Sequence, residues 1–338
     1  MNFLITGAAG FIGSNFIDHL IENTNDTIVG LDRLSYASDI RNINHHIANN
    51  SNRFSFVNAD MNDEEVVKSI DYNIVVNFAA DTHVTRSLND SREFIKNDIL
   101  ATDSLLRSSI KNKKLKLFVH ISTSEVYGTS FNEKKMSEAH PLNPRSPYAA
   151  AKCGADRLVS SYGTSFKLPF VIIRPFNNYG PKQHLEKLIP RFITSIDRNE
   201  RINIHGNGKA MRDYIHVRDT CDAIYKLIKS KKKKIGEIFN IGSGEKISIN
   251  EIANKLFKLA KKKRILKHNI FDRPGQVDLH WCNYKKFSRR FGWKPKIKFN
   301  DGLRETFQWY LSNKMWWKDK LLERKVRVVM PNGKIFFH

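Results

Sequence analysis

The sequence NFLITGAAGFIG, residues 2–13, decides the fold. Its first five residues, Asn2 to Thr6, are apolar enough to predict a short buried strand, and Ser14 to Glu22 follow with helical spacing. Glycines at such a strand-to-helix turn let the backbone approach a phosphate, and the helix N-terminus offers free N–H groups and a positive dipole end. The pattern predicts a dinucleotide-binding turn made of Gly7, Gly10, Phe11, Ile12 and Gly13.

The second predicted strand indicates which dinucleotide this turn prefers. Residues 27–31 are mostly apolar and end in Asp32, which lies 19 residues after Gly13. A carboxylate at that place accepts hydrogen bonds from an adenosine ribose and repels a 2′-phosphate. The sequence therefore favours NAD over NADP, although the neighbouring Arg33 softens that preference.

Strands and helices alternate along the first half of the chain. Further apolar runs predict strands at residues 54–57, 74–78, 117–121, 170–174 and 239–242. Asp60 and Met61 follow the first of these runs and are placed to cover an adenine, whereas the small Ala79 and Ala80 follow the second and let a dinucleotide lie against the sheet. This alternation predicts an α/β fold, a Rossmann-type doubly wound parallel sheet.

The pattern loosens after residue 176 and predicts a smaller, mostly C-terminal substrate-binding lobe. We assign residues 1–176 and about 213–243 to the NAD-binding domain, and residues 177–212 and 244–317 to the lobe. A long helix is predicted over residues 92–107, and its apolar stripe comprises Phe94, Ile95, Ile99, Leu105 and Leu106. Residues 318–338 form a basic extension, in which residues 326–337 alternate around an Asn-Gly turn and predict a hairpin.

Composition excludes several classes of protein. The net charge of +23 favours a lysine-rich solvated surface over a nucleic-acid interface, because no aromatic residues interleave with the lysine runs. A basic module that binds NAD or nucleic acid without turnover stays the non-enzyme alternative. The three cysteines have no metal-ligand spacing, so we expect reduced thiols, no metal site and a cytoplasmic protein. No apolar run approaches the roughly 20 residues of a membrane span, and no signal peptide is expected.

A cluster of polar residues follows the strand at residues 117–121. Thr123, Ser124 and Glu125 come at its carboxyl end, where open α/β sheets bind their ligands. Tyr148 and Lys152 have i,i+4 spacing and share one helix face. An ammonium group one turn away can lower the pKa of a tyrosine, which then serves as a base. We therefore expect Tyr148 to take a hydroxyl proton as hydride leaves, with Thr123 or Ser122 bonded to the same oxygen.

These features together resemble the extended short-chain dehydrogenase/reductase family, and within it the nucleotide-sugar 4,6-dehydratases that act on dTDP-glucose and UDP-glucose. The segments that carry the resemblance extend over roughly residues 1–317: LDRLSYASDIRNI (31–43), FAADTHVTRS (78–87), STSEVYG (122–128), SPYAAAK (146–152), NNYGPKQHLEKLIPRFI (177–193), INIHGNGKAMRDYIHV (202–217), FNIGSGE (239–245), DRPGQVD (272–278) and FQWYLSNKMWW (307–317).

The resemblance implies a reaction cycle. Tyr148 deprotonates the 4-hydroxyl of the glucose, Glu125 removes the proton on carbon 5, the 6-hydroxyl leaves as water, and hydride returns from the cofactor to carbon 6. The product is a 4-keto-6-deoxy sugar of rhamnose-type biosynthesis. The resemblance also implies a homodimer formed through helices near residues 98–107 and 148–162, and a nucleotide-sugar substrate without nucleic-acid or membrane partners.

Residue by residue, the resemblance extends both binding sites. It adds Leu34, Ser35, Asn97, Tyr148, Lys152 and Asn178 to the cofactor site. It assigns the substrate to Thr82, Thr123, Asn177, Lys187, Leu188, Asn203, His205, Arg212, Asn240, Arg273 and Gln276, of which Arg212 and Arg273 suit a diphosphate by charge and geometry.

One position departs from the dehydratase pattern. Those enzymes have an aspartic acid between the threonine and the glutamate, where this chain has Ser124. A serine hydroxyl is a poor acid at neutral pH. UDP-glucuronate decarboxylases have the sequence Thr-Ser-Glu at this place. A decarboxylase therefore stays an alternative, as does a nucleotide-sugar 4-epimerase. In a dehydratase, we expect Glu125 or a water held by Ser124 to supply the missing proton.

Overall fold

A computed structural model describes residues 1–232, 234–262, 266–272, 274–329, 333 and 335–337. A seven-stranded parallel sheet forms its centre, in the order β11-β6-β5-β4-β1-β2-β3. The order reverses beside β1, which is the switch point where such sheets bind ligands. The strands are β1 (Asn2–Thr6), β2 (Thr27–Asp32), β3 (Phe54–Asn58), β4 (Ile74–Asn77), β5 (Leu117–Ile121), β6 (Phe170–Pro175) and β11 (Glu237–Ile241). The predicted doubly wound sheet is confirmed.

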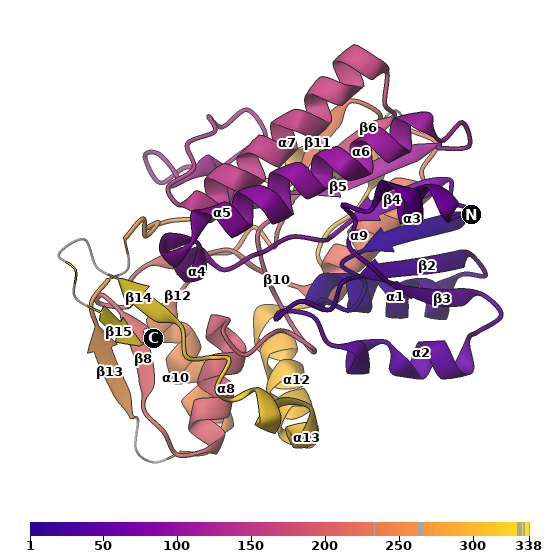
Figure 1. Ribbon diagram of the computed structural model, residues 1–338. Helices are drawn as coiled ribbons and strands as arrows, with labels where there is room; N and C mark the ends of the chain where they lie inside the picture. The colour runs from indigo at the N-terminus through magenta and orange to yellow at the C-terminus, as the bar shows by residue number, and fades with distance from the viewer. Residues whose placement is uncertain (233, 263–265, 273, 330–332, 334, 338) are drawn as a thin grey trace.

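Helices cover both faces of this sheet (Figure 1). On one face, α1 (Phe11–Asn23) and α9 (Val217–Lys229) pack against the strands, with α2 (Asn44–Asn49) farther along. On the other face lie α3 (Glu64–Ser69), α6 (Ala101–Lys111) and α7 (Pro147–Phe166). Because both faces are buried, β4 and β5 are apolar along nearly their whole length, as the continuous hydrophobic runs predicted.

A second lobe has its own hydrophobic core below the sheet edge (Figure 1). It comes from α8 (Leu188–Asp197), α10 (Ile249–Leu259) and α12 (Phe299–Ser312), with a parallel pair, β8 (Ile202–His205) and β13 (Lys267–Ile270). Two further pairs connect the lobe with the sheet: β7 (Asn177–Tyr179) with β10 (Tyr214–His216), and β9 (Met211–Arg212) with β12 (Ile247–Ser248). The chain therefore crosses between the lobes more than once, as expected.

The remaining elements are short. They are η1 (Ile40–Asn42), α4 (Val84–Asn89), α5 (Ser91–Phe94), η2 (Ile95–Leu100), η3 (Ser124–Tyr127), α11 (Lys285–Phe291), α13 (Lys314–Trp317) and η4 (Lys318–Lys320). Among the residues that the structure describes, no helix combines the length and the apolar character needed to cross a bilayer.

The described strands of the C-terminal extension pair as the predicted hairpin requires, and the extension touches both lobes, whereas residues 330–332, 334 and 338 lie outside the described residues. Its strands β14 (Arg327–Val329) and β15 (Ile335–Phe337) pair antiparallel, and β14 lies against α4 (Figure 1). Lys320 pairs with Asp39 of the sheet domain, whereas Arg324 pairs with Glu200 of the second lobe. The extension therefore contacts both lobes through its charged side chains.

The long helix predicted over residues 92–107 differs from expectation in its middle. Residues 95–100 form a π-helical segment between α5 and α6. Because a π turn holds an extra residue, the apolar stripe is rotated out of register there. Phe94, Leu105 and Leu106 are buried as predicted, but Ile95 is 47% exposed, so its assignment to the stripe was wrong.

A buried ion pair holds α7 against β6. The Arg174 guanidinium donates to both carboxylate oxygens of Asp156 at 2.8 and 2.9 Å, and both side chains are almost fully buried. Arg174 also donates to the Tyr127 hydroxyl at 2.9 Å, which ties η3 to the same pair. Burial alone would raise the pKa of Asp156, but the hydrogen bonds and charges of Arg174 and Arg157 outweigh it and lower the pKa to about 2.

We expect Asp156→Asn to lower the free energy of unfolding by about 3–5 kcal/mol, because it leaves a buried guanidinium without its counter-charge. In the wild type, the depressed pKa stabilises the fold above the unfolded value near 3.8, and this stability is lost as pH falls towards 2. Urea unfolding measured between pH 7 and pH 2 should therefore show that the free energy of unfolding falls more steeply with decreasing pH for the wild type than for the variant. Equal slopes would contradict the assignment.

Candidate active site

A cavity of about 400 Å³ lies between the carboxyl edge of the sheet and the second lobe. Nearly all the residues predicted for the site line it, although they come from segments far apart in the sequence. The sequence-predicted residues on its wall are Gly7, Gly10, Phe11, Ile12, Gly13, Asp32, Ser35, Asp60, Met61, Ala79, Ala80, Thr82, Asn97, Thr123, Ser124, Glu125, Tyr148, Lys152, Asn177, Asn178, Lys187, Leu188, Asn203, His205, Arg212 and Gln276. Among the described residues Leu34 and Asn240 are the exceptions. Arg273 lies outside the described residues.

The glycine turn has the geometry that a pyrophosphate requires. Gly7 has a φ of +65°, and a Cβ there would lie 2.7 Å from the Ala79 nitrogen. A Cβ on Gly13 would strike the Gly7 carbonyl oxygen. The first turn of α1 has neither an acidic residue nor a side-chain cap. Its N–H groups and dipole therefore suit an anion in the cavity.

Asp32 ends β2 at the other side of this turn. Its carboxylate accepts hydrogen bonds from the Ala9 N–H at 3.0 Å and the Leu34 N–H at 2.8 Å, and burial raises its pKa. Leu34 itself packs against the core beneath the sheet, with a φ of +57°. Its side chain does not line the cavity, so a role of Leu34 in the cofactor site stays a prediction.

Arg33 lines the cavity next to Asp32. Its guanidinium donates to the carboxylate of Asp60 and to the side-chain oxygen of Asn97, each at 3.0 Å. Asn97 in turn donates to Asp81 at 2.6 Å. These contacts hold the guanidinium beside Asp60 and partly offset its charge.

The catalytic candidates meet at the end of β5. Thr123 caps η3 by accepting the Glu125 N–H at 3.2 Å, and its hydroxyl also bonds Tyr148. Ser146 is the N-cap of α7, and Pro147 occupies the first helical position. The helix that begins there places Tyr148 and Lys152 on the same cavity. Tyr148, Thr123 and Glu125 thus line one pocket.

The expected lowering of the Tyr148 pKa by Lys152 is not found. Burial raises the pKa of Tyr148, the bond to Thr123 opposes this, and Asp98 and Glu125 raise it further. The Lys152 ammonium donates to the Ile121 carbonyl at 2.9 Å, and burial lowers its own pKa while Asp98 opposes that shift. The lysine's charge therefore acts on the Ile121 carbonyl and on Asp98, and it does not offset the burial that raises the pKa of Tyr148.

Sequence reasoning missed a histidine behind Ser124. His280 is fully buried, and its Nδ1 lies 3.5 Å from the Ser124 hydroxyl oxygen and 3.7 Å from a carboxylate oxygen of Glu125. It lies 156 residues after Ser124 and has no periodic or motif signal, so only a structure could find it.

The second lobe supplies a cationic end of the cavity. Arg212 is buried, and its guanidinium donates to the carbonyl oxygens of Met211 and Val277. Its guanidinium lines the cavity and the partners that the structure gives it are carbonyl oxygens, so its positive charge suits an anionic group. Arg273 lies outside the described residues. Asn240 was wrongly expected here: its amide accepts from Tyr127 and donates to Met136 behind β11, because β11 turns it away from the cavity.

Two further charged residues line this end and were not predicted. Arg191 is buried, and burial together with Arg324 lowers its pKa to about 10. Glu186 is also buried; burial would raise its pKa, but the surrounding cationic residues, among them His83 and Lys187, lower it to about 2. Arg86 pairs with Glu186 at 2.7 Å. Both residues lie in the segment EKLIPR (186–191), whose charged residues could have indicated them from the sequence.

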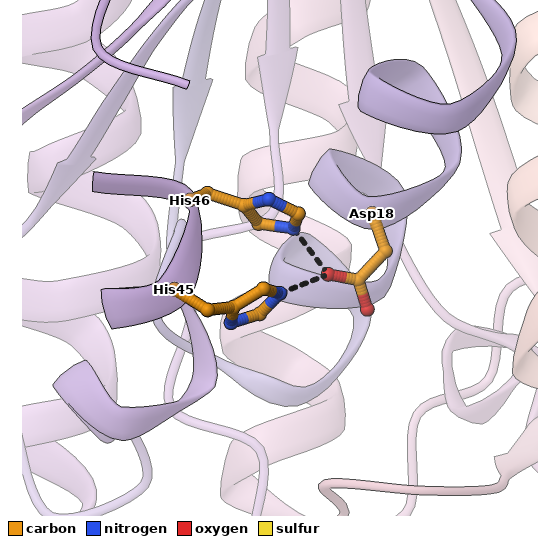
Figure 2. A group of neighbouring side chains, drawn as sticks. All are labelled: Asp18, His45 and His46. Carbon is orange, nitrogen blue, oxygen red and sulfur yellow. Dashed lines mark hydrogen bonds and ion pairs between the residues drawn. The ribbon is translucent and has the colours of Figure 1, made fainter. Parts of the chain in front are cut away.

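Asp18, His45 and His46 form one group with metal-ligand chemistry among the described residues (Figure 2). His46 Nε2 lies 2.7 Å and His45 Nε2 3.7 Å from the same Asp18 oxygen. The Lys182 ammonium, however, lies 2.7 Å from the other Asp18 oxygen and donates to the Asn42 carbonyl at 2.9 Å. The Lys182 ammonium therefore already balances the charge of Asp18. The group acts as a network of ion pairs that holds Lys182 and α2 against α1.

Comparisons with known proteins agree with this geometry. The family model described as GDP-mannose 4,6 dehydratase matches residues 4–306. Low-salt glycan biosynthesis protein Agl12 of Haloferax volcanii is 38% identical over 93% of this chain and 99% of its own length. A dTDP-glucose 4,6-dehydratase of an Actinoplanes species is 34% identical over 94% of this chain and 100% of its own length.

Two solved structures have the same fold at similar identity. A double mutant of dTDP-glucose 4,6-dehydratase from Streptomyces venezuelae, with NAD bound, has a TM-score of 0.90, 32% identity, and covers 94% of this chain and 99% of its own. UDP-glucuronic acid 4-epimerase from Bacillus cereus has a TM-score of 0.87, 31% identity, and covers 92% of this chain and 99% of its own. With the glycine turn and the Thr-Ser-Glu, Tyr148 and Lys152 set in one cavity, the chain belongs to the nucleotide-sugar 4,6-dehydratases of the extended short-chain dehydrogenase/reductase family.

Proposed function

We propose that this chain is an NAD-dependent hydro-lyase that converts UDP-glucose or dTDP-glucose to the 4-keto-6-deoxy sugar. The observation that carries the proposal is that Tyr148, Thr123 and Glu125 line the cavity that begins at the glycine turn. A base for a hydroxyl proton and a separate carboxylate for a carbon-bound proton are what oxidation followed by elimination requires. A binding module without turnover has no use for both groups.

The residues present fit NAD. The open N-terminus of α1 and the close approach of Gly7 and Gly13 suit its pyrophosphate, Asp32 suits the adenosine ribose, and Asp60 and Met61 lie where an adenine would pack. When bound, NAD supplies the acceptor for the hydride from carbon 4 and the donor that returns it to carbon 6. The dTDP-glucose 4,6-dehydratase relatives with NAD bound support this choice.

The chain's own residues handle the protons. Tyr148 takes the 4-hydroxyl proton while Thr123, bonded to the tyrosine, holds the same substrate oxygen. The resulting ketone acidifies carbon 5, and Glu125 removes that proton. Arg212 and Arg191, at the second-lobe end, hold the diphosphate, with Lys187, Asn203, His205 and Gln276 around the nucleotide. The proposed substrate is therefore a glucose nucleotide, with either uridine or thymidine as its nucleoside.

A decarboxylase is the second candidate, and Ser124 favours it. The Thr-Ser-Glu sequence leaves no acid beside Thr123 to protonate a departing hydroxyl, and loss of carbon dioxide needs none. The substrate's carboxylate would then lie near carbon 5, within reach of Glu125. The segments NNYGP (177–181) and EKLIP (186–190) oppose this reading, because the decarboxylases lack them. A 4-epimerase needs only the tyrosine and no base on carbon 5.

The test is a separate incubation with UDP-glucose, dTDP-glucose and UDP-glucuronate, followed by mass analysis of the products. We expect one of the two glucose nucleotides to lose the mass of water. Loss of carbon dioxide from UDP-glucuronate would replace the proposal by a decarboxylase, and an unchanged mass with an inverted carbon 4 would indicate an epimerase. Unaltered substrate in all three incubations would refute an enzyme of this kind.

A homodimer in the cytoplasm completes the proposal. Ile95 and Leu100 of η2 and Phe166 at the end of α7 are large apolar side chains that are 47%, 55% and 57% exposed. Leu100 lies within the first of the two helical regions predicted to pair, and Ile95 and Phe166 lie a few residues beyond their ends, which supports an interface nearby. Cys153, Cys221 and Cys282 are free thiols, as expected in a reducing compartment.

A further inference from the structure

The hydroxyl group on carbon 6 leaves as hydroxide, a poor leaving group, unless its oxygen is protonated as the bond to carbon breaks. Ser124 lines the cavity beside Glu125, but a serine hydroxyl alone is a poor acid at neutral pH. A proton source for that hydroxyl has to be sought among the groups that touch Ser124, and the imidazole of His280 is one of them.

The tautomer of His280 follows from its contact with Gly128. The Nε2 atom lies 2.7 Å from the Gly128 carbonyl oxygen, which can only accept a hydrogen bond. Nε2 therefore carries a proton, and Nδ1 is the nitrogen that gains and loses one. Nδ1 faces the Ser124 hydroxyl at 3.5 Å and a Glu125 carboxylate oxygen at 3.7 Å, distances that a small side-chain rotation would close.

The backbone holds this ring in place from two sides. The His280 N–H donates to the Met211 carbonyl at 3.0 Å, and the next residue, Trp281, accepts the Met136 N–H at 2.7 Å. The Phe176 ring, which lines the cavity, lies edge-on to the imidazole with centroids 6.1 Å apart. A fully buried imidazole fixed in this way can pass a proton between two neighbours with little movement.

We propose that His280 is a positioning residue that carries a proton from Glu125 to Ser124 during loss of water, an inference that rests on the proposed dehydration. Glu125 takes the carbon 5 proton and passes it to His280 Nδ1. As the bond between carbon 6 and its oxygen breaks, Ser124 gives its hydroxyl proton to the departing oxygen and regains one from Nδ1. Glu125 and His280 return to their starting forms, and water and the carbon 5–carbon 6 double bond result.

The test compares His280→Gln with His140→Gln under single-turnover conditions with the active glucose nucleotide. Glutamine can keep the bond to the Gly128 carbonyl but cannot pass a proton as Nδ1 does. His140 is the matched control, since its Nε2 lies 3.2 Å from the neighbouring Thr129 carbonyl and it does not line the cavity. We expect His280→Gln to slow loss of water by about 10²-fold, with oxidation at carbon 4 unchanged, and His140→Gln to affect neither step.

A rescue experiment separates a relay from a structural role. Ser124→Asp places a carboxylic acid at the departing oxygen, so it should raise loss of water in the wild type and restore it in the His280→Gln background. If His280→Gln slows oxidation at carbon 4 and loss of water equally, or if Ser124→Asp does not restore loss of water, the relay is overturned. If His280→Gln fails to fold, His280→Asn takes its place in the same experiment. A wild type that oxidises no glucose nucleotide would instead refute the proposed function, and the two failures are therefore distinguishable.

Discussion

Tyr148→Phe should lower kcat for oxidation at carbon 4 by about 10²- to 10⁴-fold, because it removes the group that accepts the hydroxyl proton. Substrate binding should change little, since phenylalanine keeps the ring that packs edge-on against Phe94. Because burial raises the pKa of Tyr148, only a small fraction is ionised at neutral pH. The wild-type rate should therefore rise as pH increases through the neutral and alkaline range, and the variant should lose this rise. Stopped-flow oxidation rates against pH measure both effects.

Tyr162→Phe is the matched control for this prediction. Tyr162 lies on the same helix, and its hydroxyl donates to Asp103 at 2.6 Å outside the cavity. Its replacement removes the hydroxyl of another tyrosine on the same helix, a residue that is buried overall, without touching the reaction. A Tyr148→Phe variant with the wild-type rate and pH profile would show that another group takes the proton.

Glu125→Gln should block the second half of the reaction and spare the first. The amide cannot remove the carbon 5 proton, so loss of water should fall by about 10²- to 10⁴-fold. Oxidation at carbon 4 should persist, because Tyr148 and Thr123 are unchanged. A sugar lacking the mass of two hydrogen atoms should accumulate, and in heavy water the wild-type incorporation of solvent deuterium at carbon 5 should disappear. Mass spectrometry of quenched reactions resolves these species.

Glu138→Gln controls for loss of a partly buried carboxylate near the same sheet edge. Its carboxylate accepts the Asn240 N–H at 2.8 Å and does not line the cavity. It should incorporate deuterium at carbon 5 and lose water at close to the wild-type rate. Persistent deuterium exchange in Glu125→Gln would exclude Glu125 as the base.

The parts of the fold that depend on neighbours in sequence were predictable. The glycine turn, Asp32 at the end of β2 and the i,i+4 pair on α7 follow from local rules, because strand ends and helix faces are set by residues a few positions apart. Ile95 shows where such rules fail. A single inserted π segment rotates one stretch of an otherwise regular helix, and periodicity does not reveal it.

The sequence by itself determined the doubly wound sheet, the dinucleotide turn and the identity of the groups at the β5 end. The tertiary structure alone decided the direction in which several side chains point. It turned Leu34 into the core and Asn240 behind β11, and it brought His280 to Ser124. For Asn240 and His280 the physical reason is that their positions depend on contacts between segments more than 100 residues apart, with Tyr127 and Ser124 respectively, which no local pattern encodes.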